Sequence, residues 1–344
     1  MKRKRYIGVI LIALIFAAGY IVWVFFGPTV NEPKNKYFYI YTGSSYQSVK
    51  DSLVNNDIVS GTFWFDKISG YLNYDKKVKP GKYKVTEGMS LLNLVRMLRS
   101  GNQSPVNLVI TKLRTKEDLA GKLSKSFEAD SSTVINFLTN NDSLAKYNLD
   151  TNTVMTAIIP NTYTLKWNNT PSTVFKRLYN EKEKFWTTKR KAQAAALNFT
   201  EQQIYTLASI VEEETNATAD KGKIASVYIN RMRTGMRLAA DPTVKFAMKD
   251  FGLKRIYHKH LAFQSPYNTY LNAGLPPGPI CTPSIKTIDA VLNAPSTNYL
   301  FFVAKSDFSG LSNFATTYSE HLKYAKEYQL ALDTLMKAKQ QQSQ

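Results

Sequence analysis

The N-terminal stretch of the chain is the feature that most limits its possible folds. Residues 6–26 form an uncharged, mainly apolar run that directly follows the basic residues Lys2, Arg3, Lys4 and Arg5. About 20 apolar residues in a helix cross the roughly 30 Å hydrocarbon core of a bilayer. Because backbone groups in lipid must satisfy their own hydrogen bonds, this run is predicted to be one transmembrane helix.

A cleaved signal peptide is the competing interpretation of the same run. Ala17, Ala18 and Gly19 are small enough to lie near a cleavage site. The apolar run nevertheless continues to Phe26, beyond the roughly 7–15 residues of a signal-peptide core, so an uncleaved anchor is favoured. By the positive-inside rule the basic head, residues 1–5, stays in the cytoplasm. The sequence thus predicts a single-pass protein of the cytoplasmic (inner) membrane with its remaining chain outside the cytoplasm.

The composition limits the partners of this extracytoplasmic part. The 344 residues carry a formal net charge of +19, which points to nucleic acid, anionic lipid or an acidic cell-wall polymer, or serves solubility alone. Placement outside the cytoplasm argues against nucleic acid and leaves the cell wall and lipid headgroups. The single cysteine, Cys281, excludes an intramolecular disulfide and a cysteine metal cluster.

Hydrophobic patterns after the anchor predict two folded parts of class α+β. Residues 27–36 contain two prolines and a glycine and are predicted to be a linker. Residues 37–111 show strand and helix patterns in the order β-α-α-β-α-β, a small mixed module. Residues 112–338 are mostly helical, with a buried-type strand at 299–306 and a frayed tail at 339–344.

The second part contains a helix pair followed by a long irregular segment. Helices are predicted at 200–215 and 219–234, and Gly235 fits the position just after the second helix. Residues 240–284 are rich in proline, glycine, asparagine and tyrosine. Such a long loop is uncommon in a compact domain unless it builds a functional site.

Three consecutive glutamates close the first helix of this pair. At about 100° per residue, with Leu207 at zero, Glu214 falls at about −20°, near the centre of the apolar arc. Glu213 falls at about −120°, on the polar side, and Glu212 at about +140°, at its border. The helical period therefore predicts that Glu213 is solvated and that Glu214 faces the apolar interior.

Burial of Glu214 would matter because it disfavours the charged carboxylate and raises its pKa. A carboxylic acid that is protonated near neutral pH can act as a general acid. Two alternatives remain open: Glu214 pairs with a buried arginine, or the helix ends early and leaves it solvated.

Other groupings of reactive residues are weaker. His258 and His260 lack a third ligand cluster nearby, so a polar loop is favoured over a metal site. The chain has no nucleophile elbow, Walker motif or dinucleotide-binding glycine motif. Neither a metal nor a cofactor is therefore predicted. Asp241 is a plausible second carboxylate, although Asp-Pro often marks only a turn.

The long loop also offers aromatic rings and amides. Tyr267, Asn268, Tyr270 and Asn272 resemble the lining of a carbohydrate groove, where flat rings face sugars and amides bind hydroxyls. Alternatively, these residues brace the loop.

Four ordered motifs resemble the YceG-like endolytic murein transglycosylases. They are LASIVEEET (207–215), VYINRMRTGMRLAADPTV (227–244), SPYNTYLNAGLPPGPICTP (265–283) and FATTYSEH (314–321). The resemblance covers nearly the whole chain. It implies that residues 37–111 are a LysM-like module and that residues 112–338 are the catalytic domain.

The family's chemistry implies an expected site. The second acid of the family's E-x-E-T motif is catalytic, and this position is Glu214 here. The remaining site residues expected from the resemblance are Asp241, Thr243, Tyr267, Asn268 and Thr269 for substrate binding, and Glu212, Asn230 and Arg231 for support. Asn161 and Ser312 stand where the family can have an acid and a histidine, so no role is carried over to them.

The implied reaction cuts the β-1,4 bond between N-acetylmuramic acid and N-acetylglucosamine within peptidoglycan strands. It leaves 1,6-anhydromuramyl ends and consumes no water, and it terminates or releases nascent strands near the membrane, with peptidoglycan synthases as candidate partners. Two rival functions remain open. One is a muramidase-type hydrolase that pairs Glu214 with Asp241 or Glu212, and the other is a non-catalytic scaffold that binds peptidoglycan.

Overall fold

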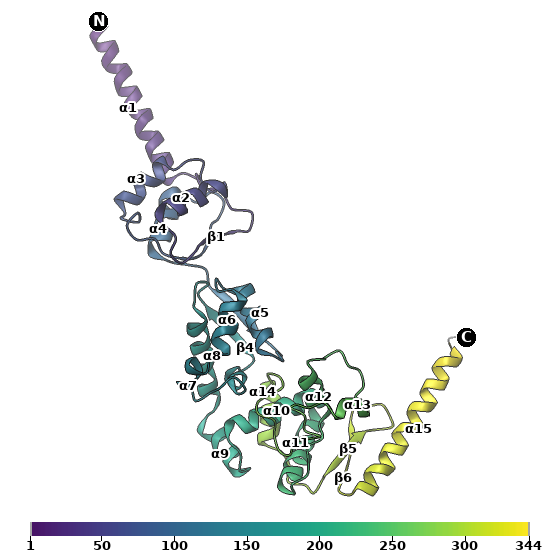
Figure 1. Cartoon of the computed structure of the whole chain (residues 1–344). Coiled ribbons are helices and arrows are strands. Elements are labelled where there is room, and N and C mark those ends of the chain that lie inside the picture. The colour runs from purple at the N-terminus through teal and green to yellow at the C-terminus, as the bar shows by residue number, and fades with distance from the viewer. Residues whose placement is uncertain (1, 343–344) are drawn as a thin grey trace. The chain divides into compact units, whose positions relative to one another are not determined.

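The computed structural model describes residues 2–342, and its contacts divide the chain into two compact units (Figure 1). The ends of the expected head (1–5) and tail (339–344), residues 1 and 343–344, lie outside the described residues. The first unit comprises Met1–Leu108, Leu123–Asp130 and Thr164–Thr170, and the second comprises Val109–Lys122, Ser131–Tyr163 and Pro171–Gln344.

Helix α1 (Lys2–Phe26) occupies the predicted anchor. From Arg5 to Phe26 it has a mean hydropathy of 2.7 and is long and apolar enough to cross a membrane. Only its last turns pack inside the unit, where the rings of Tyr20 and Phe25 meet Trp64 edge-on at centroid distances of 6.3 and 6.0 Å. Most of its apolar surface is exposed, as expected of a helix that is covered by lipid.

The module follows the predicted order of elements. These are β1 (Tyr37–Ile40), α2 (Tyr46–Asn55), α3 (Phe63–Tyr71), β2 (Gly81–Lys84), α4 (Leu91–Ser100) and β3 (Val106–Ile110). Strands β1 and β2 pair antiparallel, with Phe38 opposite Tyr83, and both of these side chains are buried. Strand β3 pairs instead with β4 (Asn161–Leu165), so the described residues form three separate two-stranded sheets.

The segment 27–36 is not the free linker that its prolines predict. The side chain of Val30 is 1% exposed and lies in the hydrophobic core of the module. The backbone N–H of Val30 donates to the carbonyl of Met89 at 3.1 Å, and the N–H of Asn31 donates to that of Ile58 at 3.0 Å. Residues 27–36 are therefore part of the module.

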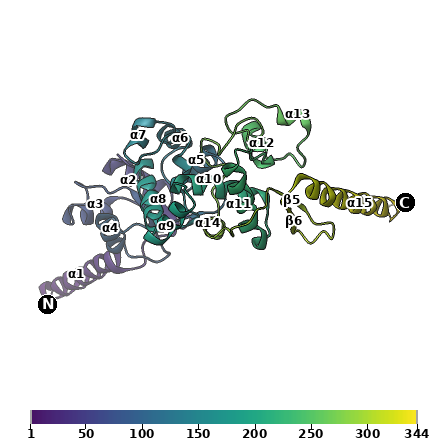
Figure 2. The ribbon, with the colours of Figure 1, turned by 90° about the horizontal axis from the view of Figure 1, so that it is seen from below.

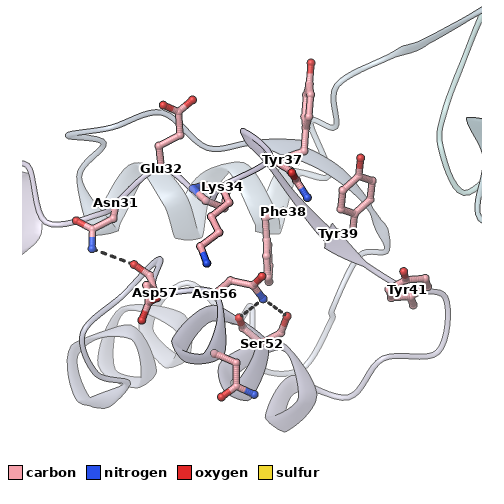
Figure 3. A pocket seen from close by; sticks show the side chains of 13 residues that line it. Asn31, Glu32, Lys34, Tyr37, Phe38, Tyr39, Tyr41, Ser52, Asn56 and Asp57 are labelled. Carbon is pink, nitrogen blue, oxygen red and sulfur yellow. Dashed lines mark hydrogen bonds between the residues drawn. The ribbon is translucent and has the colours of Figure 1, made fainter.

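A polar cavity of about 550 Å³ opens beside this segment (Figure 3). Tyr37, Tyr39 and Tyr41 of the β1 region lie on one side of it, and the end of α2 lies on the other. At its edge the amide of Asn31 donates to the carbonyl of Asp57 at 2.9 Å. The cavity thus combines phenol rings with amide and carboxylate groups.

Two later segments of the chain pack on the module. Trp167 lies edge-on against the rings of Tyr39 and Tyr41, with centroids 5.0 and 5.2 Å apart. The backbone N–H and hydroxyl of Thr42 donate to the carboxylate of Glu128 at 2.6 and 2.7 Å. The boundary between residues 111 and 112 expected from the sequence therefore leaves out part of this unit.

The second unit is mainly helical. Its elements, with α5 and β4 extending into the first unit, are α5 (Lys116–Ser126), α6 (Ser131–Leu138), α7 (Asn141–Ala145), the 3₁₀ helix η1 (Val154–Ala157), β4, α8 (Pro171–Phe185), α9 (Thr188–Ala196), α10 (Glu201–Glu214), α11 (Thr218–Arg233), α12 (Asp241–Met248), α13 (His258–Leu261), α14 (Ile285–Leu292), β5 (Phe301–Ala304), β6 (Ser312–Ala315) and α15 (Tyr318–Gln342).

Helix α10 forms the centre of this unit. A capping box formed by Thr200 and Gln203 starts the helix, and such a box satisfies two otherwise unpaired backbone donors. Residues Ile204–Val211 are all buried, because α11, α12 and α14 pack around the helix. Figures 1 and 2 show α10, α11 and α14 side by side. The helix therefore lacks the polar face that its sequence period predicts over these turns.

The segment predicted to be irregular, 240–284, contains two helices. Pro242 lies in the first turn of α12, where its missing N–H costs no helical hydrogen bond. The short helix α13 follows, and its His260 accepts a hydrogen bond from the N–H of Tyr257 at 3.2 Å. Gly235, which ends α11, has a φ of +72° as predicted for a residue just beyond a helix.

Candidate active site

Glu214 is the last residue of α10, where the chain turns into the extended residue Thr215 before α11. The hydroxyl of Tyr228, on α11, donates a hydrogen bond to Oε1 of Glu214 at 2.5 Å. Tyr228 is 1% exposed, whereas Glu214 remains partly accessible. Helices α10 and α11 therefore fix the carboxyl group through the bond from Tyr228, and part of the Glu214 side chain stays accessible to a ligand.

The surroundings of Glu214 make it a weak acid. Burial is the main cause and raises the pKa of its carboxyl group to about 7. The hydrogen bond from Tyr228 opposes this rise, the negative charge of Asp241 adds to it, and the positive charges of Arg231 and Lys245 reduce it. Near neutral pH a large fraction of Glu214 is therefore protonated and able to donate a proton.

Glu212 belongs to a polar cluster that joins three helices. Its Oε2 accepts from Lys221 at 2.8 Å, from Ser284 at 3.0 Å and from the hydroxyl of Thr287. Burial acts to raise the pKa of Glu212, but the hydrogen bonds from Lys221, Thr287 and Ser284 and the charge of Lys221 outweigh it and lower the pKa. This geometry gives Glu212 a supporting position between α10, α11 and α14.

Glu213 is not solvated, contrary to the prediction from the helical period. Its side chain is 15% exposed and forms ion pairs with Lys112 at 2.7 Å and Arg114 at 3.1 Å. The segment between β3 and α5 brings both cations to this side of α10. Because the two cations lie about a hundred residues earlier in the chain, the period of one helix does not reveal them.

Asp241 and Tyr270 form a second polar pair near Glu214. Asp241 is the exposed first residue of α12, and its Oδ1 accepts from the hydroxyl of Tyr270 at 2.6 Å. Burial raises the pKa of Tyr270 above its usual range, with further contributions from Asp241 and Glu214. Tyr270 thus stays protonated and presents Asp241 in a fixed orientation.

Three of the residues predicted to bind substrate are fully buried. Thr243, Asn268 and Thr269 are 0%, 0% and 1% exposed. The hydroxyls of Thr243 and Thr269 lie 2.9 Å apart, and the amide of Asn268 donates to two carbonyls of the α13 segment at 2.9 Å each. In this structure these buried side chains hold the loop against α12. The expectation that they bind substrate stays a prediction.

Tyr267 keeps some exposure and lines a cavity of about 190 Å³. Its ring packs on Phe246 with the centroids 4.7 Å apart. Burial raises the pKa of the Tyr267 hydroxyl to about 12, so the group is a proton donor for hydrogen bonds at neutral pH. The expected role of Tyr267 in substrate binding stays a prediction.

Asn230 and Arg231 hold the segment before β5 against α11. The amide of Asn230 donates to the carbonyls of Thr297 and Tyr299 at 2.8 and 3.0 Å. The guanidinium of Arg231 donates to the carbonyl of Leu300 at 2.7 Å. Both geometries suit the supporting role expected for these residues.

The two positions that depart from the family pattern lie at the starts of strands. Asn161 is exposed at the start of β4, and Ser312 begins β6 with its N–H donating to Asp220 at 2.6 Å. Within the described part of the chain, the hydrogen bonds of these two positions lead to Thr162 and Asp220 and not to Glu214.

The site also includes residues that were not identified as site residues from the sequence. These are Tyr228 and Lys245. A tyrosine inside the buried stretch of α11 needs a partner for its hydroxyl, and the end of the preceding helix supplies one. This requirement is the signal by which Tyr228 is recognisable in the sequence.

Comparison with known proteins gives a consistent result. The model of the YceG-like family matches residues 38–327. The endolytic murein transglycosylase of Bacillus subtilis (strain 168) is 29% identical over 313 residues, covering 84% of this chain and 83% of that protein. The protein of the same name from Streptococcus pneumoniae (strain D39) is 26% identical over 340 residues, covering 86% of this chain and 60% of that protein.

A solved structure shares the fold. The 2.6 Å crystal structure of a YceG-like protein from Listeria monocytogenes is 26% identical and has a TM-score of 0.55. The match covers 83% of this chain and 98% of that one. Since the family model spans most of the sequence, including both helices that carry Glu214 and Tyr228, the chain belongs to the YceG-like family.

Proposed function

We propose that this protein is a membrane-anchored lytic transglycosylase that cuts peptidoglycan strands internally, with Glu214 as its catalytic acid and base. The observation that carries the proposal is the Glu214–Tyr228 pair, a carboxyl group with a pKa of about 7 held at the end of a buried helix. The names of the bacterial relatives support the same substrate.

In the first step protonated Glu214 donates its proton to the glycosidic oxygen. The bond between this oxygen and C1 of N-acetylmuramic acid breaks through an oxocarbenium-like transition state. The hydrogen bond from Tyr228 fixes the carboxyl group and stabilises the carboxylate that this step produces.

In the second step the 6-hydroxyl of the same muramyl residue attacks C1 and closes a 1,6-anhydro ring. Ionised Glu214 accepts the proton that this hydroxyl loses, so the acid is restored and no water is consumed. Because the nucleophile belongs to the substrate, the reaction gains the advantage of an intramolecular attack.

Asp241 and Tyr270 are placed to hold the sugars beside Glu214. Asp241 is exposed and offers carboxylate oxygens to sugar hydroxyls, and Tyr270 orients it. Its negative charge also helps to keep Glu214 protonated. Thr243, Asn268 and Thr269 keep this part of the loop rigid.

Helix α1 would keep the enzyme next to newly made strands. A single apolar helix that follows a basic head supports an anchor with the N-terminus inside. The polar, tyrosine-lined cavity of the module supports a LysM-like role in contacting the glycan (Figure 3). Cleavage close to the membrane then terminates or releases nascent strands.

A muramidase-type hydrolase is the second candidate, and one observation favours it. Asp241 lies close enough to Glu214 to affect its pKa, so a second carboxylate is available to activate water or to act as a nucleophile. In this reaction the products carry reducing ends instead of anhydro ends.

Mass analysis of digested glycan strands tests both candidates. The wild-type protein should release 1,6-anhydromuramyl ends, and Glu214→Gln should lower the rate by about 10²–10⁴-fold. Glu213→Gln is the control, because it removes a neighbouring carboxylate that forms ion pairs elsewhere. Reducing ends would establish the hydrolase, and an active Glu214→Gln protein would refute the assignment of the site.

A further inference from the structure

The 190 Å³ cavity beside Tyr267 has an unusual lining for a site that binds only neutral sugars. Its walls include the apolar side chains of Met155, Phe246 and Pro279. Its rim carries three cations, Arg114, Lys116 and Lys249, and one acid, Glu117. The formal charge of the lining is therefore 3 − 1 = +2.

The three cations of this rim differ in how strongly they are bound by other groups of the protein. Lys116 donates to the carbonyl of Thr151 at 2.9 Å, and Arg114 is paired with Glu213. Lys249 is 72% exposed and lies 3.7 Å from a Glu117 carboxylate that is itself 56% exposed. A solvated ion pair of this kind contributes little stabilising free energy. Lys249 is therefore available to an incoming anion.

The cavity is linked to the proposed catalytic residue through the side chains of helix α12. A smaller cavity of about 50 Å³ shares Arg114 and Phe246 with it and adds Lys245 and Glu213 to the lining. Lys245 influences the ionisation of Glu214, and Glu213 is the neighbour of Glu214 in α10. Helix α12 therefore connects the cation-rimmed cavity to the reacting carboxyl group.

The substrate class supplies one kind of anion close to the scissile bond. The sugar rings of peptidoglycan are neutral, but the lactyl group of muramic acid carries a peptide with small alkyl side chains and free carboxylates. An apolar wall with a cationic rim matches this combination, because alkyl groups gain from burial and carboxylates gain from hydrogen bonds to cations.

The geometry points to this cavity as a subsite for the carboxylate-bearing peptide of the muramyl residue, with Lys249 as a specificity-determining residue. This inference rests on the proposed function, since only a muramyl substrate brings such a peptide to Glu214. It makes the enzyme selective for strands that still carry peptides over strands from which the peptides have been removed.

The test compares two substrates with the full chain in detergent. One substrate is uncrosslinked glycan that carries its peptides, and the other is the same glycan after an amidase has removed them. Wild-type kcat/KM should be about tenfold higher for the peptide-bearing strands. Lys249→Gln should reduce this preference by about fivefold, the size expected for one partly solvated ion pair, and leave the rate on peptide-free strands unchanged.

Three variants make the comparison specific. Lys249→Glu should reduce the preference further, and Lys249→Arg should keep it, because the charge decides the effect. Lys254→Gln is the matched control, since it removes an exposed cation five residues later in the chain that does not line the cavity. An equal wild-type rate on both substrates, or equal losses on both in Lys249→Gln, would overturn the inference.

A binding measurement separates this inference from the catalytic proposal. Calorimetry with Glu214→Gln should show weaker binding of a disaccharide without its peptide than of the disaccharide-peptide. Adding Lys249→Gln should remove most of that difference. Peptide-dependent binding without any cleavage by the wild type would refute the proposed chemistry alone, whereas peptide-independent binding would refute the subsite.

Discussion

The hydroxyl of Tyr228 donates a hydrogen bond of 2.5 Å to Oε1 of Glu214, and this bond couples the ionisation of the proposed acid to a buried neighbour. The bond favours the ionised carboxylate and so lowers the pKa of Glu214. Tyr228→Phe should therefore shift the alkaline limb of the pH–rate profile upward by about one unit, since hydrogen bonds to charged groups contribute about 1.5–3 kcal/mol. The maximal rate should fall about tenfold as the carboxyl group loses its orientation.

Tyr205→Phe is the control for this experiment. Tyr205 is a buried tyrosine of the same core, and its hydroxyl donates to the carbonyl of Ile158 at 2.5 Å. The variant should lose stability but keep the wild-type pH–rate profile. Identical pH profiles for Tyr228→Phe and the wild type would rule out the coupling.

Glu214→Gln should make the folded protein more stable at pH 8. Between pH 4.5, the ordinary pKa, and pH 7, the folded-state pKa, the unfolded chain ionises this residue and the folded chain does not. The folded state therefore loses stability as pH rises through this window, by about 3 kcal/mol in total. Denaturant unfolding at pH 5 and pH 8 should show a larger gain for the variant at pH 8, and a variant less stable than the wild type there would contradict the raised pKa.

Glu212→Gln should have the opposite effect. The pKa of Glu212 is lowered in the folded protein, so its ionised form contributes stability above the ordinary value of 4.5. That contribution disappears as pH falls through the folded-state pKa. At pH 7 the variant leaves Lys221, 8% exposed, without its charge partner, and should lower the free energy of unfolding by about 2–4 kcal/mol.

Glu181→Gln provides the comparison for this prediction. Glu181 pairs with Arg177 one helical turn away, at 2.7 Å, and the two side chains are 23% and 39% exposed. Loss of this pair should cost about 0.3–0.5 kcal/mol. Equal losses in the two variants would show that the Glu212 cluster is not a buried ion pair.

Gly278→Ala should disrupt the wall of the cavity beside Tyr267. A Cβ atom at this position would lie 2.0 Å from the carbonyl oxygen of Asn152, which belongs to the backbone. The strain should cost about 1–3 kcal/mol, measurable as a lower midpoint of denaturation. Gly252→Ala should be tolerated, because its Cβ would meet only a side-chain oxygen of Asp250 at 3.6 Å.

Removal of residues 28–36 should destabilise the module. A chain that begins at residue 37 lacks Val30, whose side chain is 1% exposed in the core. Compared with a chain that begins at residue 28, it should lose about 1.5–3 kcal/mol, detectable by the fluorescence of Trp64 during denaturation. Equal stability of the two chains would restore the interpretation of this segment as a linker.

Local signals explain what the sequence predicted well. The helix predicted at 200–215 is found at Glu201–Glu214, because Thr200 and Gln203 cap its start. The helix predicted at 219–234 is found at Thr218–Arg233, because Gly235 ends it with a positive φ. Each of these signals lies within a few residues of the boundary that it sets.

Long-range contacts explain what the sequence did not reveal. The environment of Glu213 depends on Lys112 and Arg114, which a single helical period cannot include. Strand β3 is the last element of the module in sequence but pairs with β4. The Asp-Pro pair at residues 241–242 was interpreted as a turn, but it starts helix α12. An Asp-Pro pair is compatible both with a turn and with the first turn of a helix, so the sequence alone does not distinguish them.

The helical wheel singled out Glu214 although one of its premises was wrong. The wheel assumed that α10 has a polar face, whereas residues Ile204–Val211 are buried all round. The direction assigned to Glu214 still agrees with partial burial, which is the main cause of its raised pKa. Thr243 and Thr269 differ from Glu214 in that their polar side chains are fully buried, which the motif that contains them does not reveal.

The alternation of the two units along the chain limits how this architecture can be rearranged. Three segments of each unit alternate, so six segments give 6 − 1 = 5 passages of the backbone between units. A module joined to the rest of its chain by a single connection could be exchanged between proteins as a unit. Excision of residues 37–111 alone would instead separate Trp167 from Tyr39 and Tyr41 and expose the ring of Trp167. The module and the part proposed to be catalytic are therefore expected to be inherited, and engineered, as one piece.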